Sequence, residues 1–268
     1  MQRFALSGVL YMVCSVSFGQ GFRILPLDIF NNDAQTRQEA TGNDLRWTVN
    51  MGGCTGSMLS PRYILSAHHC TMSKGATYTS GGCLYLGCKG DLKVISVTEK
   101  YAGFDGDIAE VAWSRVDSRW AQRYAPRVQT TAAEITLGRD GSATKLFTVG
   151  FPADKSKAMI ATGYAKSREG DYLNYNVGII NGNSGGGVWK FDDYTLVSQT
   201  NHGPHALNQP GWKNNDPENA NAWNGGPQMD RMYAKSPVLK SIFPDGVNYN
   251  VSFEGYLIHD DVLPDLDR

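Results

Sequence analysis

The 268-residue chain has little net charge, and charged residues make up only 19% of it. A formal charge of −1 provides no basic surface for nucleic acid or for an anionic membrane, so neither is expected as a partner. Apart from one short run at residues 4–16, no stretch is apolar enough for a membrane segment. With 30 glycines against that small charged share, the composition favours many turns and short strands, and hence a mostly β protein.

Cysteine is scarce as well, with 5 in the chain. One of them, Cys14, lies in the short apolar run, which is followed by small residues and therefore predicts an export signal over residues 1–19. Removing that signal leaves an even number of cysteines, which in an exported chain predicts two disulfides. Three pairings are possible, and local proximity favours the pairs Cys54–Cys70 and Cys83–Cys88.

The remaining cysteines fit a metal site poorly, because no two of them have the CxxC spacing of zinc sites. We therefore expect neither a metal nor a cofactor. The expected location is secreted, either extracellular or periplasmic, without membrane attachment once the signal is removed. The expected parts are a propeptide or N-terminal segment at 20–44, a folded domain at 45–243 and a C-terminal extension at 244–268.

Short β-type runs alternate with turn clusters from residue 45 onward. They fall into two sets on either side of a polar connection, which favours two antiparallel barrels, at about 45–125 and 140–235, over a βαβ sheet. A helix is expected over 236–243, with Pro237 in its first turn. The predicted strands are 45–51, 54–59, 62–66, 92–98, 107–114, 144–150, 157–164, 171–179, 187–191 and 194–200.

Residues 182–187, Gly-Asn-Ser-Gly-Gly-Gly, hold Ser184 between glycines. A serine hydroxyl becomes a useful nucleophile at neutral pH when a histidine takes its proton and an acid holds that histidine in one tautomer. The glycines let backbone N–H groups turn toward a developing oxyanion. The motif therefore predicts a nucleophilic serine, provided that a histidine and an acid meet it.

Two adjacent histidines are candidates for the base. His68 and His69 follow the apolar run 63–67, which is typical of a buried strand that delivers them to an edge of a sheet. Either could serve, and we favour His69 because a disulfide through the adjacent Cys70 would fix its backbone.

Two aspartates are candidates for the acid that orients the histidine. Asp107 is preferred because it opens an apolar strand and can accept the imidazole N–H without meeting bulk water. Asp105 is the alternative, although Phe-Asp-Gly at 104–106 has the composition of a turn. The order His, Asp, Ser along the chain predicts a serine endopeptidase that cleaves protein or peptide substrates.

Two other functions remain as alternatives. Residues 182–186 also satisfy the G-x-S-x-G pattern of α/β-hydrolase esterases, but that fold needs a helix directly after the serine, and glycines and a hairpin-like pattern follow here. The second alternative keeps the peptidase fold without turnover, as a binding protein. The presence of all three candidate catalytic residues argues against it.

Three segments together resemble the signatures of the chymotrypsin-fold serine peptidases: 54–57 with 66–70, 107–109 and 182–186. Asn183, residues 24–26 with 31–33, and the turn Gly-Phe-Pro-Ala-Asp-Lys at 150–155 are similar to the bacterial glutamyl-endopeptidase branch. The resemblance covers roughly residues 45 to 240. It implies an all-β fold of two six-stranded antiparallel barrels with a short C-terminal helix. Separately, a monomer is expected.

The same resemblance implies roles for particular residues. His69 and Asp107 would come from the first barrel and Ser184 from the second, with the backbone N–H groups of Gly182 and Ser184 forming the oxyanion hole. The position that is acidic in trypsin-like members is Gly178 here, so cleavage after Lys or Arg is not expected. The glutamyl branch holds its substrate with a Thr and a His, and Ile179 and Gln199 stand at the matching positions. The expected substrate-binding residues are Gly178, Ile179, Gln199, Thr200, Asn201 and His202.

Overall fold

The computed structural model describes residues 37–40, 45, 47–82, 90–116, 127–138, 142–203 and 223–248. The predicted signal, most of the segment 20–44, the pair Cys83–Cys88 and residues 249–268 lie outside the described residues.

Strands dominate the described part of the chain. They are β1 (Gln38–Glu39), β2 (Thr48–Asn50), β3 (Thr55–Ser60), β4 (Tyr63–Ala67), β5 (Thr77–Gly82), β6 (Gly90–Tyr101), β7 (Gly106–Val116), β8 (Arg127–Val128), β9 (Lys145–Gly150), β10 (Met159–Glu169), β11 (Tyr172–Tyr175), β12 (Gly187–Lys190), β13 (Thr195–Gln199) and β14 (Asn224–Pro227). The α-helices are α2 (Met229–Lys235) and α3 (Pro237–Ile242), and the 3₁₀ turns are η2 (His68–Cys70), η3 (Ala102–Phe104), η4 (Ala132–Glu134) and η6 (Pro244–Gly246). No helix in these ranges has the length and apolar character needed to cross a membrane.

The first sheet is a closed barrel in the order β2-β3-β4-β7-β6-β5, and all its pairs are antiparallel. Apolar side chains from its strands fill the interior, as Ile64, Leu65 and Ile108 illustrate by being fully buried. Closure leaves no free edge, so β4 and β7 are fixed on both sides. The turn η2 that follows β4 and the turn that leads into β7 are therefore attached to rigid strands.

The second sheet runs in the order β14-β11-β10-β9-β12-β13-β8, with β1 paired to β10. Isolated bridges from Ser198 to Gln228 and from His202 to Gly225 bring the β13 and β14 ends together. The strands from β14 to β13 thus curl into a second barrel, while β1 and β8 add to its edges. The predicted all-β fold of two antiparallel barrels is confirmed.

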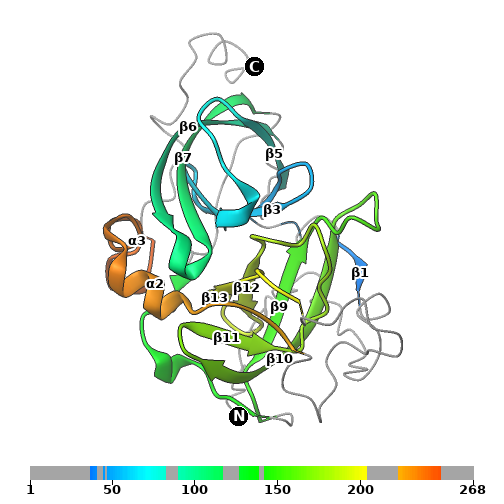
Figure 1. Cartoon of the computed structure of the whole chain (residues 1–268), viewed down its shortest axis with the longest axis vertical. Coiled ribbons are helices and arrows are strands. Elements are labelled where there is room, and N and C mark those ends of the chain that lie inside the picture. Colours follow the sequence, from blue (N-terminus) through cyan, green and yellow to red (C-terminus); the bar gives the residue numbers. More distant parts are fainter. Residues whose placement is uncertain are drawn as a thin grey trace, which may run out of the picture.

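The two barrels are joined by both packing and hydrogen bonds (Figure 1). The rings of Trp47 and Trp189 meet with their centroids 4.9 Å apart. The Gly187 N–H donates to Ser57 Oγ at 2.6 Å in a buried bond between the barrels. Because such bonds lack competing water, they fix how the barrels face one another.

The predicted strands all fall on observed ones, and the predicted helix is confirmed as α3. Ser236 caps α3 by accepting from the Leu239 N–H at 2.8 Å, and Pro237 lies in its first turn. The strands β1, β5, β8 and β14 and the helix α2 were not predicted.

Candidate active site

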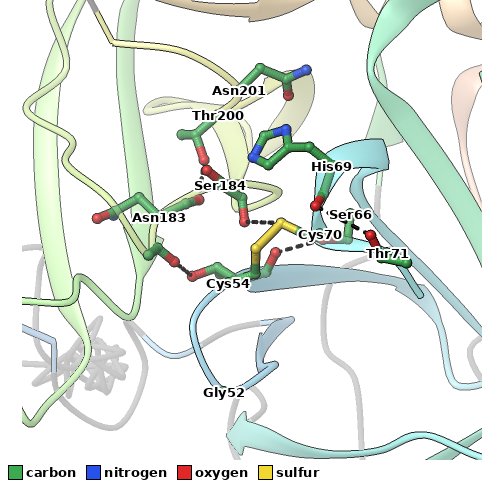
Figure 2. The surroundings of a disulfide bond; sticks show 12 residues. Gly52, Cys54, Ser66, His69, Cys70, Thr71, Asn183, Ser184, Thr200 and Asn201 are labelled. Carbon is green, nitrogen blue, oxygen red and sulfur yellow. Dashed lines mark hydrogen bonds between the residues drawn. A yellow bond between two sulfur atoms is a disulfide. The ribbon is translucent and has the colours of Figure 1, made fainter. Parts of the chain in front are cut away.

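Ser184 lies in the tight turn that leads into β12, at the seam between the barrels (Figure 2). Gly182 and Gly185 have positive φ values of 93° and 84°, a backbone region that side chains rarely adopt. A Cβ atom at Gly185 would lie 2.1 Å from Ser66 Oγ and 2.3 Å from the carbonyl oxygen of Thr55. Glycine at this position therefore lets the serine turn press directly against the first barrel.

The backbone of the serine turn is bonded to both barrels. The Thr55 N–H donates to the Ser184 carbonyl oxygen at 2.8 Å, and the Gly185 N–H donates to the Thr200 carbonyl oxygen at 2.6 Å. The first bond comes from β3 of the first barrel, and the second comes from the residue that follows β13. The position of the Ser184 backbone is therefore set from two sides.

The predicted disulfide between Cys54 and Cys70 is confirmed, with an S–S distance of 1.96 Å. It ties η2 to the start of β3, and Cys70 Sγ lies 3.6 Å from the Ser184 carbonyl oxygen (Figure 2). Closing a loop of this size stabilises a fold by about 3 kcal/mol on the chain-entropy estimate. The bond therefore fixes the turn that carries both histidines next to the serine.

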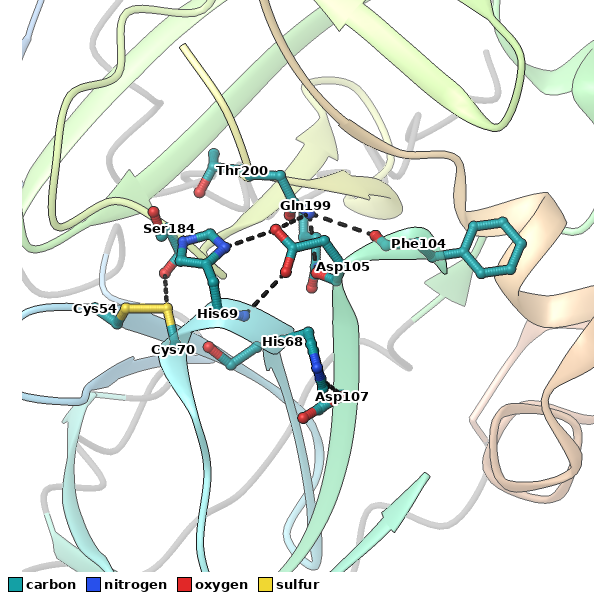
Figure 3. Close-up of polar contacts among 12 residues, drawn as sticks. Cys54, His68, His69, Cys70, Phe104, Asp105, Asp107, Ser184, Gln199 and Thr200 are labelled. Atoms are coloured by element: carbon teal, nitrogen blue, oxygen red, sulfur yellow. Dashed lines mark hydrogen bonds and ion pairs between the residues drawn. A yellow bond between two sulfur atoms is a disulfide. The ribbon is translucent and has the colours of Figure 1, made fainter. Parts of the chain in front are cut away.

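Two histidine–aspartate pairs form at η2. The His69 Nδ1 atom lies 2.6 Å from Asp105 Oδ2, and the His69 backbone N–H donates to Asp105 Oδ1 at 2.9 Å. The His68 Nδ1 atom lies 2.8 Å from Asp107 Oδ1. In Figure 3 the His69 ring lies between Asp105 and Ser184, whereas His68 points away from the serine. His69 is therefore the histidine that faces Ser184.

The structure pairs His69 with Asp105, which corrects the predicted pairing with Asp107. The antiparallel ladder of β4 and β7 places Asp107 opposite Ser66, upstream of both histidines. Asp105 precedes β7 and has a left-handed backbone, with φ of 48°, a conformation that aspartate tolerates better than most residues. This turn takes Asp105 out of the strand, so its carboxylate meets the backbone N–H and the Nδ1 atom of His69.

The Asp105 carboxylate is also held from the second barrel. Asn201 Nδ2 donates to Asp105 Oδ2 at 2.9 Å and to its backbone oxygen at 2.9 Å. The Gln199 side-chain amide donates to the same backbone oxygen at 2.8 Å (Figure 3). Gln199 is fully buried, so its predicted contact with substrate is replaced by this supporting contact.

A small pocket of about 50 Å³ opens beside Ser184, lined by residues 179–181 and 200–203 together with the serine. Among the expected substrate-binding residues, Gly178 and Gln199 are not part of this lining, whereas the other four belong to it: Ile179, Thr200, Asn201 and His202. The His202 ring packs edge-on against Tyr172, with 5.5 Å between the ring centroids. The pocket is otherwise lined by uncharged side chains.

The turn that carries Ser184 also contains the two predicted oxyanion-hole donors, the N–H groups of Gly182 and Ser184. Within the described part of the chain, the N–H groups of Gly182 and Ser184 donate to no backbone carbonyl. The peptide groups around them are fixed, because Thr55 Oγ1 donates to the Gly182 carbonyl at 2.8 Å and the Asn183 N–H donates to the Ile180 carbonyl at 3.0 Å. This arrangement leaves two N–H groups available to an oxyanion.

The residues after Ser184 rule out the esterase alternative. Strand β12 begins three residues after the serine, and the turn is followed by a hairpin with β13. An α/β-hydrolase carries its serine between a strand and a helix in a largely parallel sheet. The described sheets are antiparallel except where β8 joins β13.

One cluster of metal-ligating groups occurs in the described ranges, formed by Cys54, His69 and Cys70. Both of its sulfur atoms are used in the disulfide. A single imidazole remains, so these side chains do not form a metal-binding set.

Comparison with known proteins adds one finding about the fold. No protein-family model and no curated protein matches the chain. Among solved structures, a Glu endopeptidase in complex with MPD matches with a TM-score of 0.50 and 16% identity, over 75% of this chain and 94% of that one. The chain has a chymotrypsin-like fold. The resemblance noted in the motifs thus extends to the whole two-barrel architecture.

Asp105 was only the second choice for the acid in the sequence, and Asn201 was expected to bind substrate and not to support that acid. The Asp-Ile-Ala motif drew attention to Asp107, which opens the apolar strand. The available signal was the Asp-Gly pair at 105–106, because a turn at that point can aim a carboxylate at the end of the neighbouring strand. No local pattern marks Asn201, which reaches Asp105 from 96 residues away.

Proposed function

We propose that the protein is a serine endopeptidase with Ser184 as nucleophile, His69 as general base and Asp105 as the acid that orients the base. The observation that carries this proposal is the His69 ring lying between the Asp105 carboxylate and Ser184 (Figure 3). A nucleophile, a base within its reach and an acid behind the base are the requirements for acyl transfer. The likeness in fold to a Glu endopeptidase agrees with this class of reaction.

In the first half-reaction, Ser184 Oγ bonds to the carbonyl carbon of the peptide while His69 Nε2 takes the hydroxyl proton. Asp105 accepts the N–H of His69 Nδ1, so that Nε2 is free to act as the base, and it stabilises the imidazolium that forms. The C–N bond of the peptide then breaks, and the imidazolium gives its proton to the leaving amine. An ester between the substrate and Ser184 remains.

In the second half-reaction, His69 takes a proton from water as the water oxygen bonds to the acyl carbon. The ester bond breaks, and the proton on His69 returns to Ser184 Oγ, which restores the enzyme. In both halves the N–H groups of Gly182 and Ser184 donate to the developing oxyanion. Losing one such donor typically costs about 2.7–4 kcal/mol of transition-state stabilisation.

The pocket beside Ser184 is proposed to hold the substrate side chain that precedes the cleaved bond. Ile179 and Thr200 give it an apolar and a neutral polar wall, and no carboxylate in its described lining would pair with a Lys or Arg side chain. We therefore expect a preference for uncharged side chains. Mass spectrometry of the products from a peptide library measures this preference, and predominant cleavage after glutamate would instead assign the imidazole of His202 to substrate binding.

The Cys54–Cys70 disulfide favours an oxidising compartment, and the proposal therefore includes export to the periplasm or the extracellular space. Fractionation of the producing cells tests this part. Protein found mainly in the cytoplasm with free Cys54 and Cys70 thiols would contradict it.

Labelling with a fluorophosphonate probe tests the activity. The wild-type protein is expected to label, and Ser184→Ala is expected not to. Equal labelling of the two would refute the assigned nucleophile. Hydrolysis of casein separates the endopeptidase from a silent binding protein of the same fold, because the binding protein would leave casein intact.

A further inference from the structure

A buried arginine fastens the N-terminal segment to the second barrel. The Arg37 side chain is only 1% exposed, and its two terminal nitrogens contact the two carboxylate oxygens of Asp154 at 2.8 and 2.9 Å. A guanidinium at that depth needs a partner, and the paired geometry of two parallel bonds is the strongest that a carboxylate offers. These residues lie 117 positions apart, so the contact is specified by the fold and not by the local chain.

Strand β1 extends the same attachment. Gln38 and Glu39 pair with Ile160 and Met159 at the edge of β10, where Figure 1 shows β1 beside the second sheet. The Ala40 N–H donates to the Ala158 carbonyl oxygen, just before β10, at 2.9 Å. Residues 37–40, at the end of the predicted propeptide or N-terminal segment, therefore pack as part of the folded domain.

Asp154, the partner of Arg37, belongs to the loop 151–155, which packs against the proposed oxyanion hole. The Ala153 N–H, one residue from Asp154, donates to the Asn181 carbonyl oxygen at 2.8 Å. A Cβ atom at Gly182 would lie 2.4 Å from the carbonyl oxygen of Phe151 and 2.8 Å from the Ala153 nitrogen. The loop therefore packs against Gly182 without spare room, and a shift of the loop would be felt at the Gly182 peptide.

The inner end of this loop has a second attachment. The Phe151 N–H donates to Thr55 Oγ1 at 2.9 Å, and the same hydroxyl donates to the Gly182 carbonyl at 2.8 Å. The first barrel thus holds the loop 151–155 at its start. Arg37 holds its far end through Asp154, so the two attachments together define where the loop meets the oxyanion turn.

We propose that Arg37 is a positioning residue for the oxyanion hole, acting through Asp154 and the loop 151–155 on the Gly182 peptide. The inference rests on the proposed serine endopeptidase activity. It has a consequence for maturation: an active form retains Arg37, so any propeptide ends before this residue.

The kinetic test compares Arg37→Gln with wild type on a peptide substrate and on a peptide aldehyde, which forms a tetrahedral adduct with the serine. We expect kcat to fall ten- to hundredfold, on the order of the loss from a misplaced catalytic group, with KM within about twofold. Affinity for the aldehyde should fall in parallel with kcat, because the adduct uses the same donors. Arg37→Lys is expected to recover part of kcat.

The matched control is Glu39→Gln. Glu39 pairs with Lys157 at 2.6 Å on the same segment, but this pair is exposed and lies outside the loop. Its removal is expected to leave kcat and aldehyde affinity unchanged. If Arg37→Gln fails to fold by circular dichroism, Asp154→Asn provides the same comparison with the arginine retained.

Wild-type kcat and aldehyde affinity in folded Arg37→Gln or Asp154→Asn would overturn the inference, as would an active form whose N-terminus lies after Arg37. Fluorophosphonate labelling of Ser184 in the wild type separates this outcome from failure of the proposed function. If Arg37→Gln or Asp154→Asn has wild-type kcat and still labels at Ser184, the peptidase proposal stands and only the role of Arg37 is lost.

Discussion

The two histidine–aspartate pairs of η2 have the same chemistry in different surroundings. In one, the His69 and Asp105 side chains are 45% and 28% exposed and lie beside Ser184. In the other, Asp107 is only 3% exposed and His68 points away from the serine. Both pairs have short Nδ1–carboxylate contacts, of 2.6 and 2.8 Å. The distance between a histidine and an aspartate therefore does not distinguish the proposed catalytic pair. The position of Ser184 next to the His69 ring does.

The comparison also explains why two such pairs occur together. The His68–Asp107 pair, called the inner pair because its carboxylate is buried, holds the start of η2. Asp105 of the outer pair holds the backbone N–H and the ring of His69. We infer a division of roles in which the inner pair stabilises the turn and the outer pair takes part in proton transfer. Each prediction that follows separates these roles.

The largest difference is expected between the two histidines. His69→Ala should lower kcat/KM for a peptide by about 10⁴-fold or more, because the serine loses its proton acceptor. His68→Ala should lower it by less than about tenfold, since that ring does not face Ser184. Steady-state kinetics on both variants measures the difference, and equal losses would contradict the division of roles.

Substituting Asp105 should affect catalysis, whereas substituting Asp107 should affect stability. Asp105→Asn is expected to lower kcat by about 10⁴-fold, since the amide favours the wrong tautomer of His69. Asp107→Asn should retain most activity but lower the free energy of unfolding by about 1–3 kcal/mol, because a buried charged hydrogen bond is weakened. Kinetics and urea unfolding on the same preparations distinguish them. A larger kcat loss in Asp107→Asn would reverse the assignment.

The disulfide serves both pairs, because it anchors the turn that carries them. The double variant Cys54→Ser/Cys70→Ser should lose about 3 kcal/mol of unfolding free energy. Activity per folded molecule should fall much less than in His69→Ala. Chemical denaturation combined with active-site titration measures both quantities, and an unchanged unfolding midpoint would be inconsistent with this anchoring role.

The smallest effect is expected for Asn201, which contacts the outer pair through Asp105. Asn201→Ala should lower kcat by about tenfold, at the lower end of what one hydrogen bond to a charged group contributes. In an Asp105→Asn background the same change should cost much less, because its partner charge is already gone. A double-mutant cycle with these variants measures the coupling, and additive losses would show that Asn201 acts independently of Asp105.

The sequence was informative wherever a pattern is local. Short β-type runs between turn clusters located ten of the strands, Ser236 with Pro237 located α3, and sequence proximity located the Cys54–Cys70 bond. The glycine-flanked Ser184 and the adjacent histidines also stand out without coordinates. Each of these features depends on neighbouring residues and on the period of an element.

The sequence was misleading where two distant segments meet. Asp105 and Asp107 are two residues apart, and the choice between them depends on the register of β4 with β7 and on one left-handed residue. Gln199 occupied a plausible substrate position, but its amide is turned inward to Asp105. Arg37, in a segment without a clear pattern, is buried by a loop more than a hundred residues away.

The central claim is that His69, and not His68, works beside Ser184. A peptidyl chloromethyl ketone measures this directly, because it binds as a substrate and alkylates the imidazole next to the reactive serine, and fragmentation mass spectrometry then locates the modified histidine. The account predicts stoichiometric modification of His69, with none on His68 and none in Ser184→Ala. Modification of His68 in place of His69 would contradict it.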